Sequence, residues 1–177
     1  MKWALSILLM ISLACSEKTR NPDDYAPNAR LAELGFELPE FSTPAANFVK
    51  YRRVGNLIYL SGHGACAPRP DVATGKLGQD LTTEEGFEAA QQVGLCLLAS
   101  LNHALEGDLS KVKQIVKVNG YVNSTPEFTE QHLVMNGFSN LMTSVFGERG
   151  KHARAAVGMA SLPIDLSVEI EMIVEVE

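Results

Sequence analysis

Two charged residues near the end of the chain have the types and spacing of a small carboxylate-binding site. Arg154 lies in the run His152-Ala153-Arg154-Ala155-Ala156-Val157-Gly158, and Glu169 lies in the later run Val168-Glu169-Ile170-Glu171. A guanidinium can form two parallel hydrogen bonds to one carboxylate, and a nearby glutamate can direct a water molecule at the bound substrate. Pro163 lies between the two runs, so the segment predicts two short strands joined by a turn. We expect the second strand to return Glu169 to the neighbourhood of Arg154.

Each of these residues also has a plainer interpretation. Arg154 could form a cross-strand salt bridge, which is worth little energy on a surface. Glu169 shares its alternation phase with Glu171 and Glu175, which is also typical of a solvated acidic strand face. His152 could donate a proton to a substrate, or it could bond a neighbouring carbonyl at a strand edge.

The sequence argues against several other kinds of site. His63, His103 and His132 do not have the spacing of metal ligands, so we expect no metal site. Gly75-Lys76 lacks the remaining residues of a phosphate-binding loop, and no nucleophile elbow is present. The net charge of −6 and the absence of a Lys/Arg run argue against a nucleic-acid partner.

The N-terminal residues predict an export signal. Residues 1–15 combine a short positive start with an apolar run too short to cross a bilayer as a helix. Ala14-Cys15-Ser16 resembles a lipoprotein cleavage site, so Cys15 is a candidate for lipidation and a membrane anchor. We therefore expect an exported protein that is periplasmic, lipid-anchored or secreted. A helix that packs on the domain is the competing interpretation.

The rest of the chain divides into a linker at residues 16–44, with a short helical segment at 28–35, and a domain at residues 45–177. Within the domain the patterns predict strands at 47–53, 56–61 and 113–123, helices beginning at Thr82 and spanning 129–146, and the two final strands. The order ββαβαββ predicts an α+β domain with helices on one face of a sheet. The other face would need a cover, for which a second copy of the chain is the simplest candidate. Cys66 and Cys96 are a possible disulfide pair in an oxidising compartment, but they have no motif spacing, which favours free thiols.

Four stretches together resemble the RidA/YjgF family of enamine/imine deaminases, some of which are labelled endoribonuclease L-PSP. They are Gly55–Gly62, Phe128–Asn136, Arg154–Pro163 and Val168–Glu171, within a match that spans about residues 47–176. The run His152–Gly158 is similar to a less-characterised branch with the motif His-Ala-Arg-x-Ala-Val-Gly. The resemblance implies a chorismate-mutase-like α+β fold, with two helices on one face of a mixed sheet. It also implies a homotrimer with three clefts between subunits, and no metal or organic cofactor.

The resemblance also implies roles for individual residues. Arg154 corresponds to the family's carboxylate-binding arginine and Glu169 to its water-steering carboxylate. Ser61 and Asn136 correspond to pocket residues, although they could equally be a turn residue and a helix-surface residue.

Two positions depart from the family pattern. Phe48 stands where the deaminases have a tyrosine, and Ala156 stands where many have a cysteine. Arg154, the residue expected to bind a carboxylate, is kept, whereas polar groups around the reacting atom are lost.

The expected function is hydrolysis of small 2-imino or 2-enamino acids to a 2-keto acid and ammonia, in a cleft between subunits. The alternative is a non-catalytic trimeric module that binds a small carboxylate metabolite. Ribonuclease activity is the weakest hypothesis, because the chain is acidic.

Overall fold

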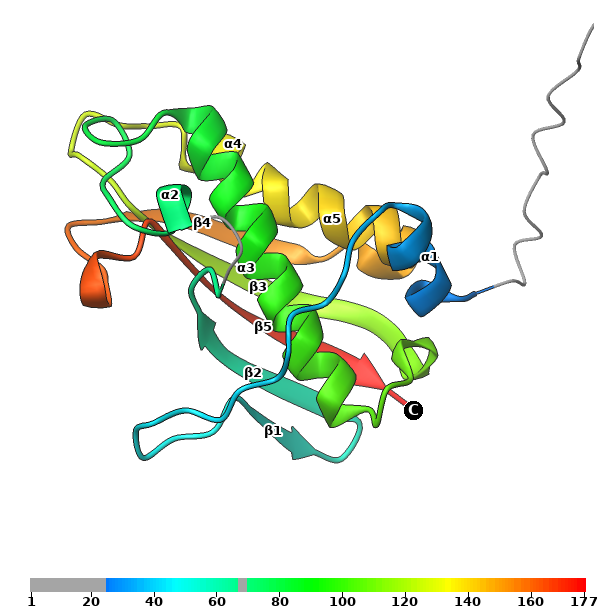
Figure 1. The fold of residues 1–177 in the computed structure, drawn as a ribbon. Coiled ribbons are helices and arrows are strands. Elements are labelled where there is room, and N and C mark those ends of the chain that lie inside the picture. The colour runs from blue at the N-terminus through cyan, green and yellow to red at the C-terminus, as the bar shows by residue number, and fades with distance from the viewer. Residues whose placement is uncertain (1–24, 67–69) are drawn as a thin grey trace, which may run out of the picture.

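A five-stranded mixed sheet with helices on one face forms the body of the computed structural model (Figure 1), which describes residues 25–66 and 70–177. The strands are β1 (Tyr51–Val54), β2 (Leu57–His63), β3 (Val112–Asn123), β4 (Ala153–Met159) and β5 (Val168–Val176). The helices are α1 (Pro27–Glu33), α2 (Pro70–Ala73), α3 (Thr83–Ala104), α4 (Gln131–Val134) and α5 (Asn136–Phe146). The predicted α+β architecture is therefore confirmed. The predicted export signal, with Cys15, lies outside the described residues.

The long helix α3 begins at a capping box. The Thr82 hydroxyl accepts a hydrogen bond from the Glu85 N–H, and the Glu85 carboxylate accepts one from the Thr82 N–H at 2.8 Å. This arrangement satisfies N–H groups that the first turn of a helix leaves without partners. Further along, Gly94 allows α5 to approach closely, because a Cβ there would lie 2.9 Å from Leu141 Cδ2. The two helices therefore form one packed layer over the sheet.

The central strand β5 separates two chemically different faces of the sheet. It is antiparallel to β2 on one side and to β3 on the other. The side chains that face the helices are buried and apolar: Val168, Ile170, Met172, Val174 and Val176. The side chains on the other face are partly exposed: Glu169, Glu171, Ile173 and Glu175. We call the helix-free side of the sheet the open face.

The last two strands are not the neighbouring pair that the sequence predicted. The strand order is β1-β2-β5-β3-β4, so β3 lies between β4 and β5. The chain crosses over through α4 and α5 after β3, and β4 therefore runs parallel to β3 at the edge of the sheet. The prediction was wrong because alternation along a strand shows that a strand exists but does not show which strand it pairs with.

The predicted helix at residues 129–146 is two helices, with a break at Met135. The Met135 side chain is fully buried over Gly120 of β3, where a Cβ would collide with it.

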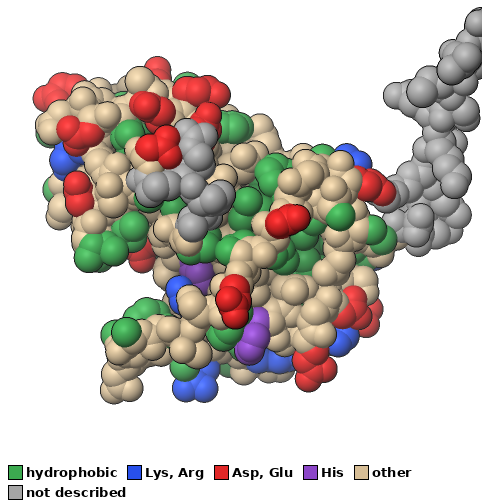
Figure 2. Space-filling view, viewed as in Figure 1, with side chains coloured by type: hydrophobic (Ala, Val, Ile, Leu, Met, Phe, Trp, Pro, Cys, Tyr) green, Lys and Arg blue, Asp and Glu red, His purple; other side chains and the backbone are tan. Residues whose placement is uncertain are grey.

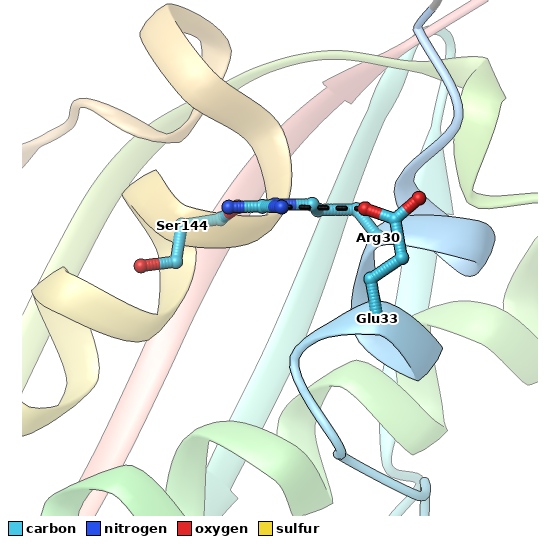
Figure 3. Close-up of polar contacts among 3 residues, drawn as sticks. All are labelled: Arg30, Glu33 and Ser144. Carbon is cyan, nitrogen blue, oxygen red and sulfur yellow. Dashed lines mark hydrogen bonds and ion pairs between the residues drawn. The ribbon is translucent and has the colours of Figure 1, made fainter. Parts of the chain in front are cut away.

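The segment predicted to be a linker contains a helix that packs on the domain. Leu31 of α1 is 3% exposed and belongs to the hydrophobic core. Arg30 Nε donates to the Ser144 carbonyl of α5 at 3.1 Å, and its Nη1 donates to Glu33 at 3.3 Å (Figure 3). The α1 part of residues 16–44 is thus bound to α5.

Cys66 and Cys96 form a disulfide, which corrects the expectation of free thiols. Their Cα atoms are 6.0 Å apart. Cys66 lies in the loop after β2, and Cys96 is buried within α3, so the bond ties the end of β2 to the helix layer. The sequence could not predict the pairing because two cysteines with no motif spacing carry no distance information.

Candidate functional site

Arg154 lies on the edge strand β4, and its side chain points toward the helices. Its register partner on β3 is Val118, which is fully buried beneath them. The Arg154 Nη1 donates to Asn136 Oδ1 at 3.1 Å and to Ser139 Oγ at 2.9 Å, and Nη2 donates to the His132 carbonyl at 3.2 Å. Three oxygens of α4 and α5 therefore hold the guanidinium in one orientation.

This arrangement leaves two of the five guanidinium N–H groups for a ligand. Among the described residues, none accepts a hydrogen bond from Nε or from the second Nη2 hydrogen of Arg154. The two donors are on adjacent nitrogens, which suits a carboxylate. Partial burial lowers the pKa of Arg154, but arginine stays protonated in proteins, so the site carries a positive charge.

His152 lies near this arginine, and both residues contact the Ser139 hydroxyl. Its Nε2 is 3.0 Å from Ser139 Oγ, and its Nδ1 is 2.7 Å from the Gly150 carbonyl oxygen. Burial lowers the pKa of His152, the nearby Arg154 lowers it further, and the Gly150 carbonyl opposes both. The ring is therefore neutral at neutral pH.

Ala156 lies two residues beyond Arg154 on the same side of β4 and packs partly buried against the core. The residues gathered on this side form what we call the helix-side group: Arg154, Asn136, Ser139, His152 and Ala156.

Glu169 lies on the open face. It pairs in register with Tyr121, and its carboxylate lies against the backbone of Gly62, where an added Cβ would overlap Oε1. No described residue donates a hydrogen bond to Glu169. Burial raises the pKa of Glu169, as does the neighbouring Glu171 carboxylate. Glu171, by contrast, accepts hydrogen bonds from Asn119 at 2.8 Å and Tyr121 at 3.0 Å.

Ser61 lies next to Gly62 on β2, and its hydroxyl donates to the Val49 carbonyl at 2.7 Å. It helps to line a hollow of about 290 Å³ on the open face, together with Asn119 and Glu171. We call Glu169, Ser61 and Gly62 the open-face group. Phe48 precedes β1, is 52% exposed and belongs to neither group.

The two charged residues that the sequence placed together therefore lie on opposite sides of the sheet. Arg154 faces the helices from β4, and Glu169 faces away from them on β5, two strands and about 10 Å across the sheet. This corrects the expectation that a strand pair would bring them together within one chain.

Sequence reasoning also missed two residues of these groups. Ser139 could have been found, because it lies three residues after Asn136 and so on the same side of a helix. Gly62 carries no side chain to suggest a role, and only the structure shows that Glu169 rests on it.

The remaining surface offers fewer groups for chemistry. A hollow of about 650 Å³ opens at the ends of β3 and β4, but Lys76, the cation that lines it, donates to Asn123 and to the Ala160 carbonyl. Over residues 25–66 and 70–177, no cluster of His, Cys, Asp or Glu could hold a metal ion. In the same part of the chain, every helix is too short or too polar to span a membrane.

Comparison with known proteins decides the family. Residues 28–176 match the family model described as "YjgF/chorismate mutase-like, putative endoribonuclease". The chain belongs to the RidA/YjgF family. The chorismate-mutase-like fold expected from the sequence motifs is thereby confirmed.

Relatives within the RidA/YjgF family differ in how much their names say. Protein TCP17 of Trypanosoma cruzi is 46% identical over 151 residues, which cover 83% of this chain and 92% of that protein. The crystal structure of Atu1372 from Agrobacterium tumefaciens, described as of unknown function, shares 48% identity with a TM-score of 0.78, covering 85% of this chain and 92% of that one. A Dermatophagoides farinae protein named 2-iminobutanoate/2-iminopropanoate deaminase is 30% identical, covering 76% of this chain and 89% of that protein.

Proposed function

We propose that this protein binds small carboxylate-bearing metabolites through Arg154 and hydrolyses 2-imino or 2-enamino acids to 2-keto acids and ammonia. The observation that carries the proposal is the hydrogen bonding of the Arg154 guanidinium. Three protein oxygens fix its orientation, and two adjacent N–H groups have no acceptor among the described residues. A charged group held in this way is suited to bind and orient one carboxylate.

The complete site requires two copies of the chain. Arg154 and Glu169 lie on opposite sides of one sheet, so they cannot contact the same small molecule within one chain. The open face and the β4 edge also carry exposed apolar side chains, including Tyr59 and Val157, which are each 43% exposed. A neighbouring copy that covers this face could place its Arg154 beside Glu169. This supports the homotrimer with clefts between subunits that the family resemblance implies.

Glu169 has the properties of a general base for this reaction. Its raised pKa makes the carboxylate a better proton acceptor near neutral pH, and it has no competing partner among the described residues. It would accept a proton from a water molecule that attacks the imine carbon. That proton passes to the nitrogen and gives a carbinolamine; a 2-enamino acid first tautomerises to the imine. Glu169 would then take the proton of the new hydroxyl group and deliver it to the nitrogen, so that the C=O bond forms, the carbon–nitrogen bond breaks, and ammonia and the 2-keto acid leave. Ser61, whose hydroxyl donates to the Val49 carbonyl, would contribute its oxygen as a hydrogen-bond acceptor beside Glu169.

A non-catalytic binding module is the second candidate function. Ala156, in the helix-side group, offers no hydrogen-bonding side-chain group where the resemblance implies a cysteine in many deaminases, so the site has one polar group fewer than they have. Phe48, where the resemblance implies a tyrosine, offers none either, although it lies outside both groups. Such a protein would keep the Arg154 anchor and bind a 2-keto acid without turnover.

One assay distinguishes these two functions. A dehydratase generates 2-aminoacrylate in solution, the purified protein is added, and release of the keto acid is followed. Deaminase activity predicts an acceleration that is lost in Arg154→Ala and in Glu169→Gln. Binding of 2-ketobutyrate without acceleration supports the binding module, and absence of both refutes the proposal.

Mixing of variants tests whether the site is shared between copies. Arg154→Ala and Glu169→Gln are each inactive, but a mixed oligomer can join an intact Arg154 of one copy to an intact Glu169 of the next. Unfolding and refolding of an equal mixture should restore about a quarter of the sites if copies assemble at random. No recovery in a mixture shown to have exchanged subunits would refute a shared site.

Export to an oxidising compartment is part of the same proposal. The Cys66–Cys96 disulfide supports it, since such bonds are rare in the reducing cytosol. Mass spectrometry of the mature protein from membrane and soluble fractions would show whether Cys15 is the lipidated first residue.

Acidic side chains gather around the start of α3, with few basic ones on this face (Figure 2), which gives no support to a nucleic-acid partner.

A further inference from the structure

A chain of hydrogen bonds connects the backbone at Gly150 to the guanidinium of Arg154. The Gly150 carbonyl can only accept, so His152 Nδ1 carries the ring proton and donates it at 2.7 Å. The neutral ring then presents a lone pair at Nε2, and the Ser139 hydroxyl donates to it at 3.0 Å. The oxygen of that hydroxyl is therefore left to accept from Arg154 Nη1 at 2.9 Å.

We propose that Ser139 and His152 are positioning residues that hold Arg154 ready to bind a carboxylate; this inference rests on the proposed function. His152 fixes the direction of the Ser139 hydroxyl, and Ser139 fixes the guanidinium. Neither residue contacts the ligand. Both act through Arg154.

The start of this chain is itself rigidly placed. Gly150 is buried where the turn Gly147–Gly150 meets the end of α5, and a Cβ there would collide with the Met142 carbonyl oxygen. The His152 ring also packs edge-on against Phe138, with ring centroids 5.6 Å apart. The imidazole is therefore held by a hydrogen bond at each nitrogen and by an aromatic contact.

A fixed guanidinium matters because a free arginine side chain has many rotamers. Ordering such a side chain when a ligand binds costs free energy, and a group already ordered in the empty site avoids that cost. Saturation of Nη1 also leaves the donors on Nε and Nη2 for the ligand. The pair thus determines which edge of Arg154 a carboxylate meets.

Substitutions at the two positions separate a hydrogen-bonding role from a packing role. Ser139→Ala removes the hydroxyl, and Ser139→Thr keeps one. His152→Phe keeps an aromatic ring beside Phe138 but removes both nitrogens, and His152→Gln restores an acceptor near Nε2. Thr143→Ala is the matched control, since its hydroxyl lies one turn further along α5 and donates to the carbonyls of Ser139 and Asn140.

The first measurement is calorimetric binding of 2-ketobutyrate to the full-length protein. We expect roughly tenfold weaker binding for Ser139→Ala and His152→Phe, partial recovery for Ser139→Thr and His152→Gln, and no change for Thr143→Ala. If Ser139→Ala binds 2-ketobutyrate with the same affinity as the wild type, this inference is overturned and the proposed function still stands. No binding by the wild type, together with no acceleration of keto-acid release, would instead refute the proposed function.

The second measurement needs no ligand. Nitrogen NMR of the wild type should show the Nδ1-protonated tautomer of His152 and slow rotation of the Arg154 guanidinium. In Ser139→Ala the guanidinium should rotate faster, while Thr143→Ala leaves it unchanged. An Nε2-protonated ring, or a guanidinium equally mobile in wild type and Ser139→Ala, would overturn the inference whatever the protein binds.

Discussion

His63 should make this protein markedly less stable in mild acid. Its side chain is 3% exposed at the end of β2, with Nδ1 2.6 Å from the Ser61 carbonyl oxygen and Nε2 2.8 Å from Ser100 Oγ. Nδ1 therefore donates, and the Ser100 hydroxyl donates to Nε2, so both nitrogens of the neutral ring are satisfied. Burial lowers the pKa of His63 to about 4, Lys50 contributes in the same direction, and the Ser61 carbonyl opposes them.

The size and sign of this loss of stability follow from the difference in the pKa of His63 between the folded and the unfolded chain. The folded protein binds this proton less readily than the unfolded chain, whose histidine has the ordinary pKa of 6.5. The contribution to stability is therefore complete above pH 6.5 and is lost as the pH falls toward 4. It amounts to about 3 kcal/mol in total, of which about 2 kcal/mol is lost between roughly pH 7.5 and 5.

Urea unfolding at one protein concentration, with the disulfide intact, measures this loss. The wild type should lose about 2 kcal/mol more than His63→Asn between roughly pH 7.5 and 5, because the variant has no imidazole to protonate. His103→Asn, at an exposed position on α3, is the control and should lose the same amount of stability as the wild type over this pH range. If the wild type and His63→Asn lose equal stability, His63 is not the buried neutral histidine that the structure indicates.

Three further variants test other parts of the structure. Gly62→Ala would displace the flexible Glu169 side chain, so keto-acid release should fall roughly tenfold or more with little change in the melting temperature; unchanged release would mean that the position of Glu169 is not used. Replacing both Cys66 and Cys96 by serine opens a loop that the disulfide closes over a sequence separation of 30 residues. Urea unfolding should show a loss of about 3–4 kcal/mol in the free energy of unfolding; equal stability of the wild type with and without reductant would contradict this. Thr82→Ala removes a helix cap and should cost about 1 kcal/mol, measured in the same way; no loss would mean that solvent replaces the cap.

The family resemblance and most elements were predictable because their signals are local. The start of α3 was marked by Thr82, and alternation marked β3 and β5, since these patterns depend on residues a few positions apart. The burial of Met135 over Gly120 was missed because Gly120 lies in a strand that is distant in the sequence.

The sequence by itself determined the types of chemical group available and the elements that carry them, because side-chain chemistry and short-range periodicity are properties of neighbouring residues. Only the tertiary structure decided that β3 lies between β4 and β5, that Arg154 and Glu169 face opposite sides of the sheet, and that Cys66 meets Cys96. These facts depend on which distant segments pack together. Pairing of that kind is set by how the whole core is buried, and no short stretch of residues contains it.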